Sequence, residues 1–229
     1  MVPCRACNNE LREHFLSLGN SPLSNAFLSK EDLNQMEIYY PLDVYVCEKC
    51  YLVQLEEFET AKNIFSSDYA YFSSYSESWL QHCKNYTEMM ISRFSFDKDS
   101  FVIEIASNDG YLLSCVPQNI TKVGIDPIGG SFNLECQCYA DLVIQDYFTA
   151  AAFKKSKYGH KKAKVITTIS MFYDLEDPKT FIQDVAQVLD DNGLWVVQLS
   201  YTPLMISGMA WDNICHEHIY YYALFNLKR

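Results

Sequence analysis

Basic residues are scarce in this sequence of 229 residues: 18 Lys and Arg stand against 29 Asp and Glu, giving a formal net charge of −11. A chain this acidic repels phosphate backbones and anionic lipids, so neither a nucleic acid nor a membrane surface is expected as a partner. A small phosphorylated ligand is still compatible with the sequence, because it needs only local donors. The N-terminus, Met-Val-Pro-Cys-Arg, has no apolar run before its first charge, so we expect no secretion signal and a cytoplasmic location.

Long apolar runs are also missing. Residues 193–211 carry no charge and approach the length of a membrane span, but several polar residues, Pro203 and Gly208 interrupt them. This stretch is therefore expected to be a buried strand followed by a loop. The chain has no internal repeat or low-complexity tract, and its 49% hydrophobic residues are typical of a globular protein.

Cysteine, by contrast, is abundant, with nine residues. A secreted disulfide scaffold would be shorter, would favour an even number of cysteines and would follow a signal peptide. The thiols are therefore expected to be reduced or bound to metal. Four of them form two Cys-x-x-Cys pairs near the N-terminus, and the others outside residues 211–218 are expected to be inert: Cys83, Cys115, Cys136 and Cys138.

The two pairs, Cys4/Cys7 and Cys47/Cys50, predict a metal site. Two residues between thiols let both sulfurs reach one ion, and four thiolates complete the tetrahedron that Zn²⁺ prefers. Such a closed shell leaves no position for a substrate, so the predicted zinc is structural. Redox dithiols and an iron–sulfur cluster are the alternatives, and the spacing is less typical of the latter.

The remaining residues are predicted to form an α/β fold. Residues 61–98 end in an amphipathic helix with Ser76 as its N-cap and one buried face of Trp79, Cys83, Tyr86, Met90 and Phe94. Beyond it, short apolar runs predict strands at 101–105, 122–125, 142–144, 165–169 and 194–199. Asp177 and Pro178 open a helix that is expected to end at residues 191–193. Apolar strands separated by helices indicate a parallel sheet covered on both faces, as in doubly wound folds.

The turn after the first of these strands, residues 107–110, is a candidate cofactor site. Ligands of parallel sheets bind at the carboxyl ends of strands. The turn matches neither G-x-G-x-x-G nor the P-loop, which disfavours a dinucleotide and a nucleoside triphosphate. Asp126, at the end of the second strand, lies where a carboxylate can accept both ribose hydroxyls. The combination favours S-adenosylmethionine (SAM), with an ordinary acidic turn as the alternative.

The chain resembles the SAM-dependent sugar C-methyltransferase family, which joins an N-terminal Cys4 zinc domain to a class I methyltransferase domain. The likeness includes the cysteine pairs and the segments PLSNAF (22–27), YAYFSSYS (69–76), SNDG (107–110) and NICHEHIYYY (213–222). It implies a zinc domain over 1–60, a connector over 61–98 that covers the active site, and a methyltransferase domain over 99–229. It also implies a cofactor-binding set of Tyr71, Ser107, Asn108, Asp109, Gly110, Asp126, Asp146, Tyr147, Ile169, Ser170 and Met171.

The most specific part of the resemblance is His216-Glu217-His218. Three interpretations compete: a His-x-His metal pair, polar residues with structural hydrogen bonds, and an acid/base group. Carbon attacks a sulfonium methyl only as an enolate or equivalent, so a C-methyltransferase needs a base for the proton next to a ketone. The resemblance implies that His218 is this base, that Glu217 orients it or binds substrate, and that His216 or Tyr222 donates to the enolate oxygen.

The sequence departs from the family at three places. Ala106 stands where the family usually has Gly, and Cys215 where antibiotic-sugar members have a Tyr. Only 30 residues follow position 199, too few for the last two strands of a class I sheet, so we expect a chain truncated at its C-terminal edge.

The predicted function is methyl transfer to a carbon next to a ketone, on a nucleotide-linked 4-keto deoxysugar. An O- or N-methyltransferase and a non-catalytic zinc-stabilised binding module are the alternatives. The oligomeric state is left open.

Overall fold

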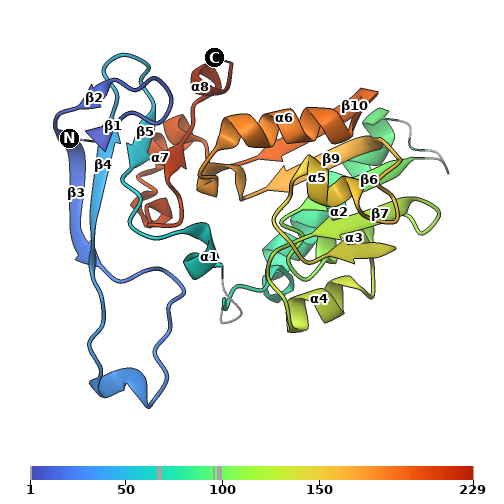
Figure 1. Cartoon of the computed structure of the whole chain (residues 1–229), viewed down its shortest axis with the longest axis horizontal. Helices are drawn as coiled ribbons and strands as arrows, with labels where there is room; N and C mark the ends of the chain where they lie inside the picture. The colour runs from blue at the N-terminus through green and yellow to red at the C-terminus, as the bar shows by residue number, and fades with distance from the viewer. Residues whose placement is uncertain (1, 66–68, 95, 97–99, 229) are drawn as a thin grey trace. The chain divides into compact units, whose positions relative to one another are not determined.

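The structure, a computed structural model, describes every residue except 1, 66–68, 95, 97–99 and 229 (Figure 1). The chain forms two compact units. The N-terminal unit comprises residues 1–69, 170–176 and 199–229, and the α/β unit comprises residues 70–169 and 177–198. The domain boundaries expected from sequence, at 60/61 and 98/99, remain a prediction. The packing adds that two segments distant in sequence, 170–176 and 199–229, group with the N-terminal residues.

The α/β unit contains the predicted parallel sheet. Its strands are β6 (Phe101–Ile105), β7 (Thr121–Ile125), β8 (Leu142–Ile144), β9 (Ala163–Ile169) and β10 (Leu189–Gln198). They lie in the order β10-β9-β6-β7-β8, with every pair parallel. The chain moves outward from β6 in one direction and then returns to continue in the other, so the switch in strand order falls between β6 and β9. The predicted α/β class is confirmed.

Helices and a core of apolar side chains accompany this sheet. They are α2 (Glu77–Phe94), α3 (Tyr111–Cys115), α4 (Ser131–Cys136), α5 (Ala150–Lys154) and α6 (Pro178–Val188), with the short η2 (Ser73–Tyr75) before α2. The predicted buried face of α2 is confirmed, because Cys83, Tyr86 and Met90 pack with Val102 and Val165 of the strands. The predicted cap is confirmed as well, since the Ser76 hydroxyl accepts the Trp79 N–H at 3.4 Å.

The helix α6 begins as predicted and ends earlier than predicted. The Asp177 carboxylate accepts the N–H groups of Lys179 and Thr180, as an N-cap does. The helix stops at Val188, and Leu189 already pairs with Ala163 in the sheet. The turn residues at 191–193 therefore lie in an irregular part of β10, where the register shifts between Leu189 and Leu194. Tertiary pairing with β9 overrode the local turn signal.

The N-terminal unit is built on a second, smaller sheet. Its strands, in the order β11-β5-β4-β3, are β11 (Tyr220–Tyr221), β5 (Val53–Leu55), β4 (Tyr40–Val46) and β3 (His14–Ser21). A two-stranded ladder joins β1 (Val2–Pro3) to β2 (Glu10–Leu11). The core contains Leu42, Val44, Leu55 and Tyr221, so the last strand is part of it.

Short helices complete the N-terminal unit: η1 (Asp32–Asn34), α1 (Ala61–Ile64), η3 (Phe172–Asp174), α7 (Thr202–Gly208), η4 (Trp211–Asn213) and α8 (Leu224–Leu227). Across the described residues of both units, no helix combines the length and the apolar character that crossing a membrane requires.

Candidate functional site

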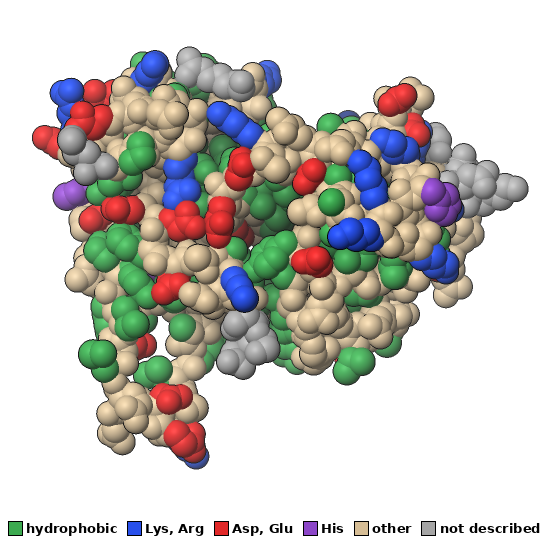
Figure 2. Space-filling view, in the orientation of Figure 1, with side chains coloured by type: hydrophobic (Ala, Val, Ile, Leu, Met, Phe, Trp, Pro, Cys, Tyr) green, Lys and Arg blue, Asp and Glu red, His purple; other side chains and the backbone are tan. Residues whose placement is uncertain are grey.

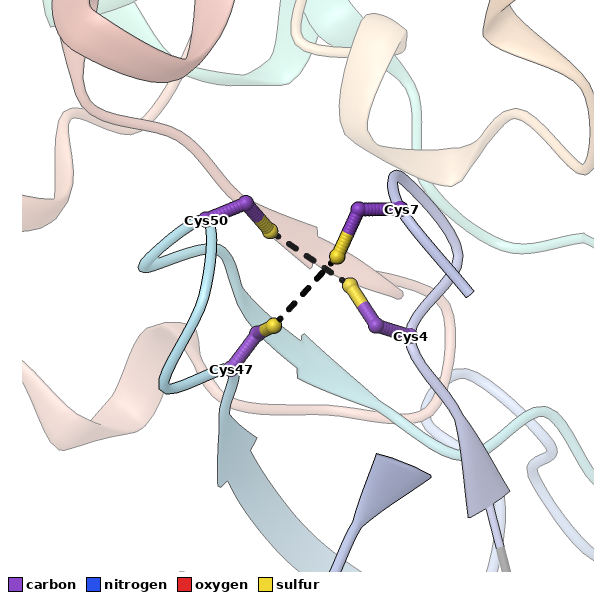
Figure 3. A group of neighbouring side chains, drawn as sticks. All are labelled: Cys4, Cys7, Cys47 and Cys50. Atoms are coloured by element: carbon purple, nitrogen blue, oxygen red, sulfur yellow. Dashed lines mark hydrogen bonds between the residues drawn. The ribbon is translucent and has the colours of Figure 1, made fainter. Parts of the chain in front are cut away.

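The four predicted metal ligands converge in the N-terminal unit (Figure 3). The sulfur atoms of Cys4, Cys7, Cys47 and Cys50 all lie within 4.8 Å of one another. The Cys4–Cys50 sulfur distance is 3.5 Å and the Cys7–Cys47 distance is 3.6 Å. The edge of a tetrahedron with Zn–S bonds of about 2.3 Å is about 3.8 Å, so only a small adjustment is needed to hold Zn²⁺. All four are free thiols.

The two cysteine pairs have the same backbone geometry. In each, the carbonyl of the first cysteine accepts an N–H four residues later, from Asn8 and from Tyr51, at 2.8 Å in both cases. Both of these residues have a φ of 58°. Asn adopts this left-handed conformation readily, whereas Tyr does so at a cost of about 1–2 kcal/mol. Because both positions adopt this conformation, the two Cys-x-x-Cys loops have the same shape and can present their sulfurs to one ion in the same way.

A polar neighbour supports the thiolate form. The Gln54 side chain donates to the Cys4 sulfur at 3.3 Å, and its residue is almost fully buried. Burial by itself raises the pKa of the Cys4 thiol, but the hydrogen bonds from Gln54 and from the N–H groups of Cys7 and Ala6 outweigh it and lower the pKa to about 7. Cys4 is therefore held closest to the deprotonated form that a bound ion requires, whereas burial raises the pKa of the Cys7 thiol and raises that of Cys50 to about 12.

The candidate cofactor turn follows β6, next to the switch in strand order. Three residues of the turn have positive φ: Ala106 at 60°, Asn108 at 49° and Gly110 at 77°. Space behind the turn is also restricted, because a Cβ on Gly110 would lie 2.7 Å from the Cys136 sulfur, and one on Gly124 would lie 2.7 Å from the Ser107 hydroxyl. The buried Cys136 thus fills the space between two glycines, as expected of an inert thiol.

Asp126 holds the turn in place from the end of β7. One of its oxygens accepts the Asn108 N–H at 2.8 Å and the other accepts the Ile128 N–H, also at 2.8 Å. The residue is 3% exposed, and burial raises the pKa of its carboxyl group despite these hydrogen bonds. Each oxygen keeps a second lone pair, so the predicted contact with ribose hydroxyls stays a prediction that the hydrogen bonding permits.

The turn is tied to the segment that carries Tyr71. Asn108 accepts the Ser73 N–H at 3.0 Å through Oδ1 and donates to the Tyr71 carbonyl at 3.0 Å through Nδ2, while Asp109 accepts the Ser74 N–H at 2.9 Å. The Tyr71 side chain is 49% exposed. Burial and the charge of Asp109 raise the pKa of its hydroxyl. The structure therefore brings the Tyr71 backbone beside the turn, and the predicted closure of its side chain over the cofactor remains a prediction.

Sequence reasoning missed the role of Glu104, at the penultimate position of β6. Its side chain is buried and its Oε2 atom has no hydrogen-bond partner among the described residues. Burial, followed by the charges of Asp109 and Asp126, raises its pKa well above the ordinary value. Three acidic side chains thus meet behind the turn, and among the described residues no Lys or Arg forms an ion pair with them. Such a group favours a cationic ligand. Its pattern in sequence, an acid inside an apolar strand, could have identified it.

The other predicted cofactor residues follow neighbouring strands. Asp146 and Tyr147 come directly after β8, where the Asp146 carboxylate accepts the Tyr147 N–H at 2.8 Å. Ile169, the last residue of β9, is buried. Because β6, β7, β8 and β9 are parallel, these residues share one edge of the sheet with the turn. Ser170 and Met171 group with the N-terminal unit, so their predicted contact with a cofactor remains untested.

His218 has the hydrogen bonding of a neutral base. Its Nδ1 atom lies 2.9 Å from the carbonyl oxygen of Asn213. Since a carbonyl only accepts, Nδ1 carries the proton and Nε2 keeps the lone pair. Burial lowers the pKa of the imidazole, and the bond to Asn213 opposes this shift only in part. The ring packs against Tyr173, with centroids 4.3 Å apart.

Glu217 and Cys215 accompany His218 on the same side. One polar atom from each of the three side chains lies within 4.8 Å of the others. Glu217 is buried, accepts from the Asn25 side chain at 3.2 Å, and has its pKa raised by burial. Asp174, which sequence reasoning also missed, has a buried Oδ1 with no hydrogen-bond partner among the described residues. Burial and the charge of Glu217 raise its pKa well above the ordinary value.

His216 and Tyr222 lie in different surroundings from His218. The His216 Nε2 atom donates to the Pro41 carbonyl at 3.1 Å, and its ring packs edge-on against Tyr40 and Phe58. The two histidines therefore do not converge as a His-x-His metal pair. Tyr222 is 7% exposed and stacks on Tyr220, with centroids 5.4 Å apart. The role of either residue as a donor to an enolate remains a prediction.

Comparison with known proteins supports two parts of this description, the zinc-binding domain and the methyltransferase fold. Residues 4–65 match the family described as "Putative zinc binding domain". The C-methyltransferase NovU of Streptomyces niveus is 27% identical over 225 residues, covering 98% of this chain and 53% of that protein. The chain thus spans about half the length of this relative.

Two solved structures show the fold of the α/β unit. The plantazolicin methyltransferase BpumL, in complex with SAH, is 12% identical with a TM-score of 0.50, covering 64% of this chain and 59% of that chain. The plantazolicin methyltransferase BamL, in complex with a triazolic desmethylPZN analog and SAH, is 13% identical with a TM-score of 0.50, covering 65% and 58% respectively. The chain therefore combines a four-cysteine zinc-binding domain with the α/β fold found in methyltransferases.

Proposed function

We propose that the protein is a SAM-dependent C-methyltransferase that acts on a carbon next to a ketone, in a nucleotide-linked 4-keto deoxysugar. The observation that carries the proposal is the acidic turn after β6. It lies at the switch in strand order of a methyltransferase fold, with three buried carboxyl groups behind it and Asp126 holding its backbone. The likeness to a named C-methyltransferase supports transfer to carbon.

The residues present fit SAM, which is a cation at its sulfonium and carries an ammonium group. Ser107, Asn108, Asp109 and Gly110 would hold its methionine part, with Asp126 on the ribose. Asp146 and Tyr147 would border the adenine, Ile169, Ser170 and Met171 would line its floor, and Tyr71 would cover it. When bound, SAM supplies an electrophilic methyl group. The buried acids Glu104 and Asp109 favour its positive charge, because a nearby cation stabilises their ionised forms.

The chain's own contribution to the chemistry is the removal and placement of a proton. With Nδ1 committed to the Asn213 carbonyl, the His218 Nε2 takes the proton from the substrate carbon, and the electron pair of that C–H bond forms the enolate. Glu217, 4.8 Å or less from the imidazole, stabilises the imidazolium that results. Tyr222 or His216 would donate to the enolate oxygen. The zinc site itself takes no part in these steps, because its four thiolates leave no open position.

The experiment replaces the base and measures two quantities. His218→Ala is expected to reduce the rate of methyl transfer to a panel of nucleotide-linked ketosugars by about 10²–10⁴-fold. Mass spectrometry of the products measures this rate. The SAM affinity of the variant, measured by calorimetry, should stay within about twofold of the original protein, and the exposed His14→Ala serves as the matched control.

Three results would contradict the proposal. Transfer that survives His218→Ala would indicate O- or N-methylation, which needs no enolising base. Equal loss of transfer and of SAM affinity would make His218 structural. Failure of the original protein to bind SAM, with one zinc per chain present, would indicate a non-catalytic binding module.

A further inference from the structure

One segment reverses the charge balance of this acidic protein. Residues 154–164, with the sequence KKSKYGHKKAK, contain six lysines, a histidine and no acidic residue. The segment follows α5 and leads into β9. Figure 2 shows Lys and Arg side chains gathered around a histidine on the part of the surface formed by the α/β unit. Neither the fold nor the proposed methyl transfer accounts for this concentration of positive charge.

The segment borders an open surface pocket of about 260 Å³, which we name the cationic pocket. Phe153 and Val188 supply its buried apolar side chains. Lys154, His160, Lys161 and Lys162 line the rest, together with Gln187 from the end of α6. The pocket therefore combines an apolar floor with a rim of nitrogen donors.

Within the part of the chain that the structure describes, no carboxylate forms an ion pair with the lysines of the rim. Among the described residues, the one ion pair with a nitrogen–oxygen distance of 4.0 Å or less is Arg5–Glu57, in the N-terminal unit. Lys154 donates to the Gln187 side-chain oxygen at 2.7 Å, and Lys162 donates to the Gln187 backbone carbonyl. Two ammonium groups thus converge on one neutral residue. The Gln187 amide in turn donates to the Asp184 carboxylate at 3.4 Å.

The rim is held in place by its own packing. The Tyr158 and Phe153 rings both pack on Phe101 of β6, with centroids 5.6 and 6.0 Å apart. The ammonium of Lys161 lies 5.5 Å from the centroid of the Tyr158 ring. A Cβ on Gly159 would lie 2.1 Å from the Lys154 carbonyl oxygen, so this turn closes only with glycine. These contacts hold the backbone that carries the exposed lysines of the rim.

We propose that the cationic pocket binds a small phosphate-bearing anion. Several ammonium groups around one cavity suit the multiple oxygens of a phosphate or diphosphate, and the apolar floor suits an attached organic group. The cavity is too small for a folded partner, and the net charge of −11 disfavours a nucleic acid.

This site is distinct from the candidate cofactor turn. The pocket is built at the amino ends of β9 and β10, whereas the turn follows the carboxyl end of β6. Because these strands are parallel, the two sites lie at opposite edges of the sheet. The proposal therefore goes beyond the methyl transfer proposed above and does not depend on it.

The test measures pyrophosphate binding to the zinc-loaded full chain by calorimetry, with and without saturating SAM. The variant K154Q/K161Q/K162Q should weaken binding at least tenfold, whereas K30Q/K62Q/K179Q, which removes the same charge from exposed positions elsewhere, should change it less than twofold. Affinity should fall about tenfold between 50 and 500 mM salt, because the contacts are ionic. The single variant K161Q, expected to weaken binding about threefold, keeps the test valid if the triple variant fails to fold.

The proposal would be overturned by absence of pyrophosphate binding at about 10 mM. Displacement of pyrophosphate by SAM would also overturn it, because the anion would then occupy the cofactor turn. Equal loss in the two triple variants would show a non-specific charge effect. None of these outcomes depends on methyl transfer, so failure of the proposed function and failure of this proposal are distinguishable.

Discussion

The four-cysteine site and the acidic turn are both suited to a positively charged ligand, but the chain brings their side chains together in different ways. The first brings four sulfurs close enough to bind one cation, and all of them come from two Cys-x-x-Cys loops with the same backbone geometry. The second gathers Glu104 on β6, Asp109 in the turn that follows, and Asp126 directly after β7. Its acids are buried by the surrounding sheet. The comparison shows that a metal site can be specified by short local motifs. A site for a cationic ligand depends instead on acidic side chains that only the folded domain buries.

The largest effect is expected from a substitution in the four-cysteine site. Cys47→Ser should abolish stoichiometric zinc binding and unfold the N-terminal unit, because structural zinc contributes on the order of 10 kcal/mol to folding of such small domains. Zinc content by atomic emission and hydrogen exchange of residues 1–60 measure the two effects. Cys138→Ser, at an exposed thiol, is the matched control and should keep one zinc per chain. If Cys47→Ser kept both its zinc and its protection from hydrogen exchange, the site would not need Cys47 as a ligand.

The second prediction concerns the pH dependence of the acidic turn. Burial raises the pKa values of Glu104 and Asp126 in the folded protein. A raised carboxyl pKa favours the fold at low pH, and this stabilisation is lost as pH rises through the folded-state pKa. The unfolding free energy without ligand should therefore fall with pH above the ordinary carboxyl range, by up to about 1.4 kcal/mol per pH unit for each group.

Urea unfolding between pH 5 and 8 measures this slope. Glu104→Gln, which has no proton to lose, should flatten it, whereas the exposed Glu88→Gln should leave it unchanged. SAM binding should release protons, since a cation lowers the carboxyl pKa values, and calorimetry in buffers of different ionisation enthalpy detects the release. An unchanged slope in Glu104→Gln would mean that this acid is not the titrating group.

The smallest effect is expected from a substitution that relieves backbone strain in the turn after β6. Ala106 has a φ of 60°, a conformation that costs an alanine more than a glycine. Ala106→Gly should therefore stabilise the protein by about 0.5–1 kcal/mol in urea unfolding. The same substitution at Ala151, an exposed position of α5, should destabilise by about 1 kcal/mol, because glycine is a poor helix former. Destabilisation at both positions would show that the turn is not strained at Ala106.

Much of the α/β unit could be predicted because its signals are local. The apolar runs placed β6 and β8 at the residues observed, and Asp177 and Pro178 located the start of α6. The end of that helix could not be predicted, because Leu189 pairs with Ala163 across the sheet and this contact overrides the turn residues that follow. The spacing of the paired cysteines likewise predicted a site that the structure assembles.

The environment of the His-Glu-His segment could not be predicted from its spacing. His216 and His218 are two residues apart, yet one donates to the Pro41 carbonyl and the other to the Asn213 carbonyl. The charge of Glu217 raises the pKa of Asp174, a residue far away in sequence. Which side chains meet around an imidazole depends on segments that only the packed N-terminal unit brings together.

The sequence by itself determined the positions of β6 and β8, the four metal ligands and the acidic turn, because periodicity and ligand spacing depend on residues near one another in the chain. Tertiary structure alone decided the order of the strands, the grouping of residues 170–176 and 199–229 with the N-terminal residues, and the raised pKa values of the buried acids. The physical reason is that burial and electrostatic interaction are set by neighbours in space. Residues distant in the chain supply those neighbours, and no local pattern records them.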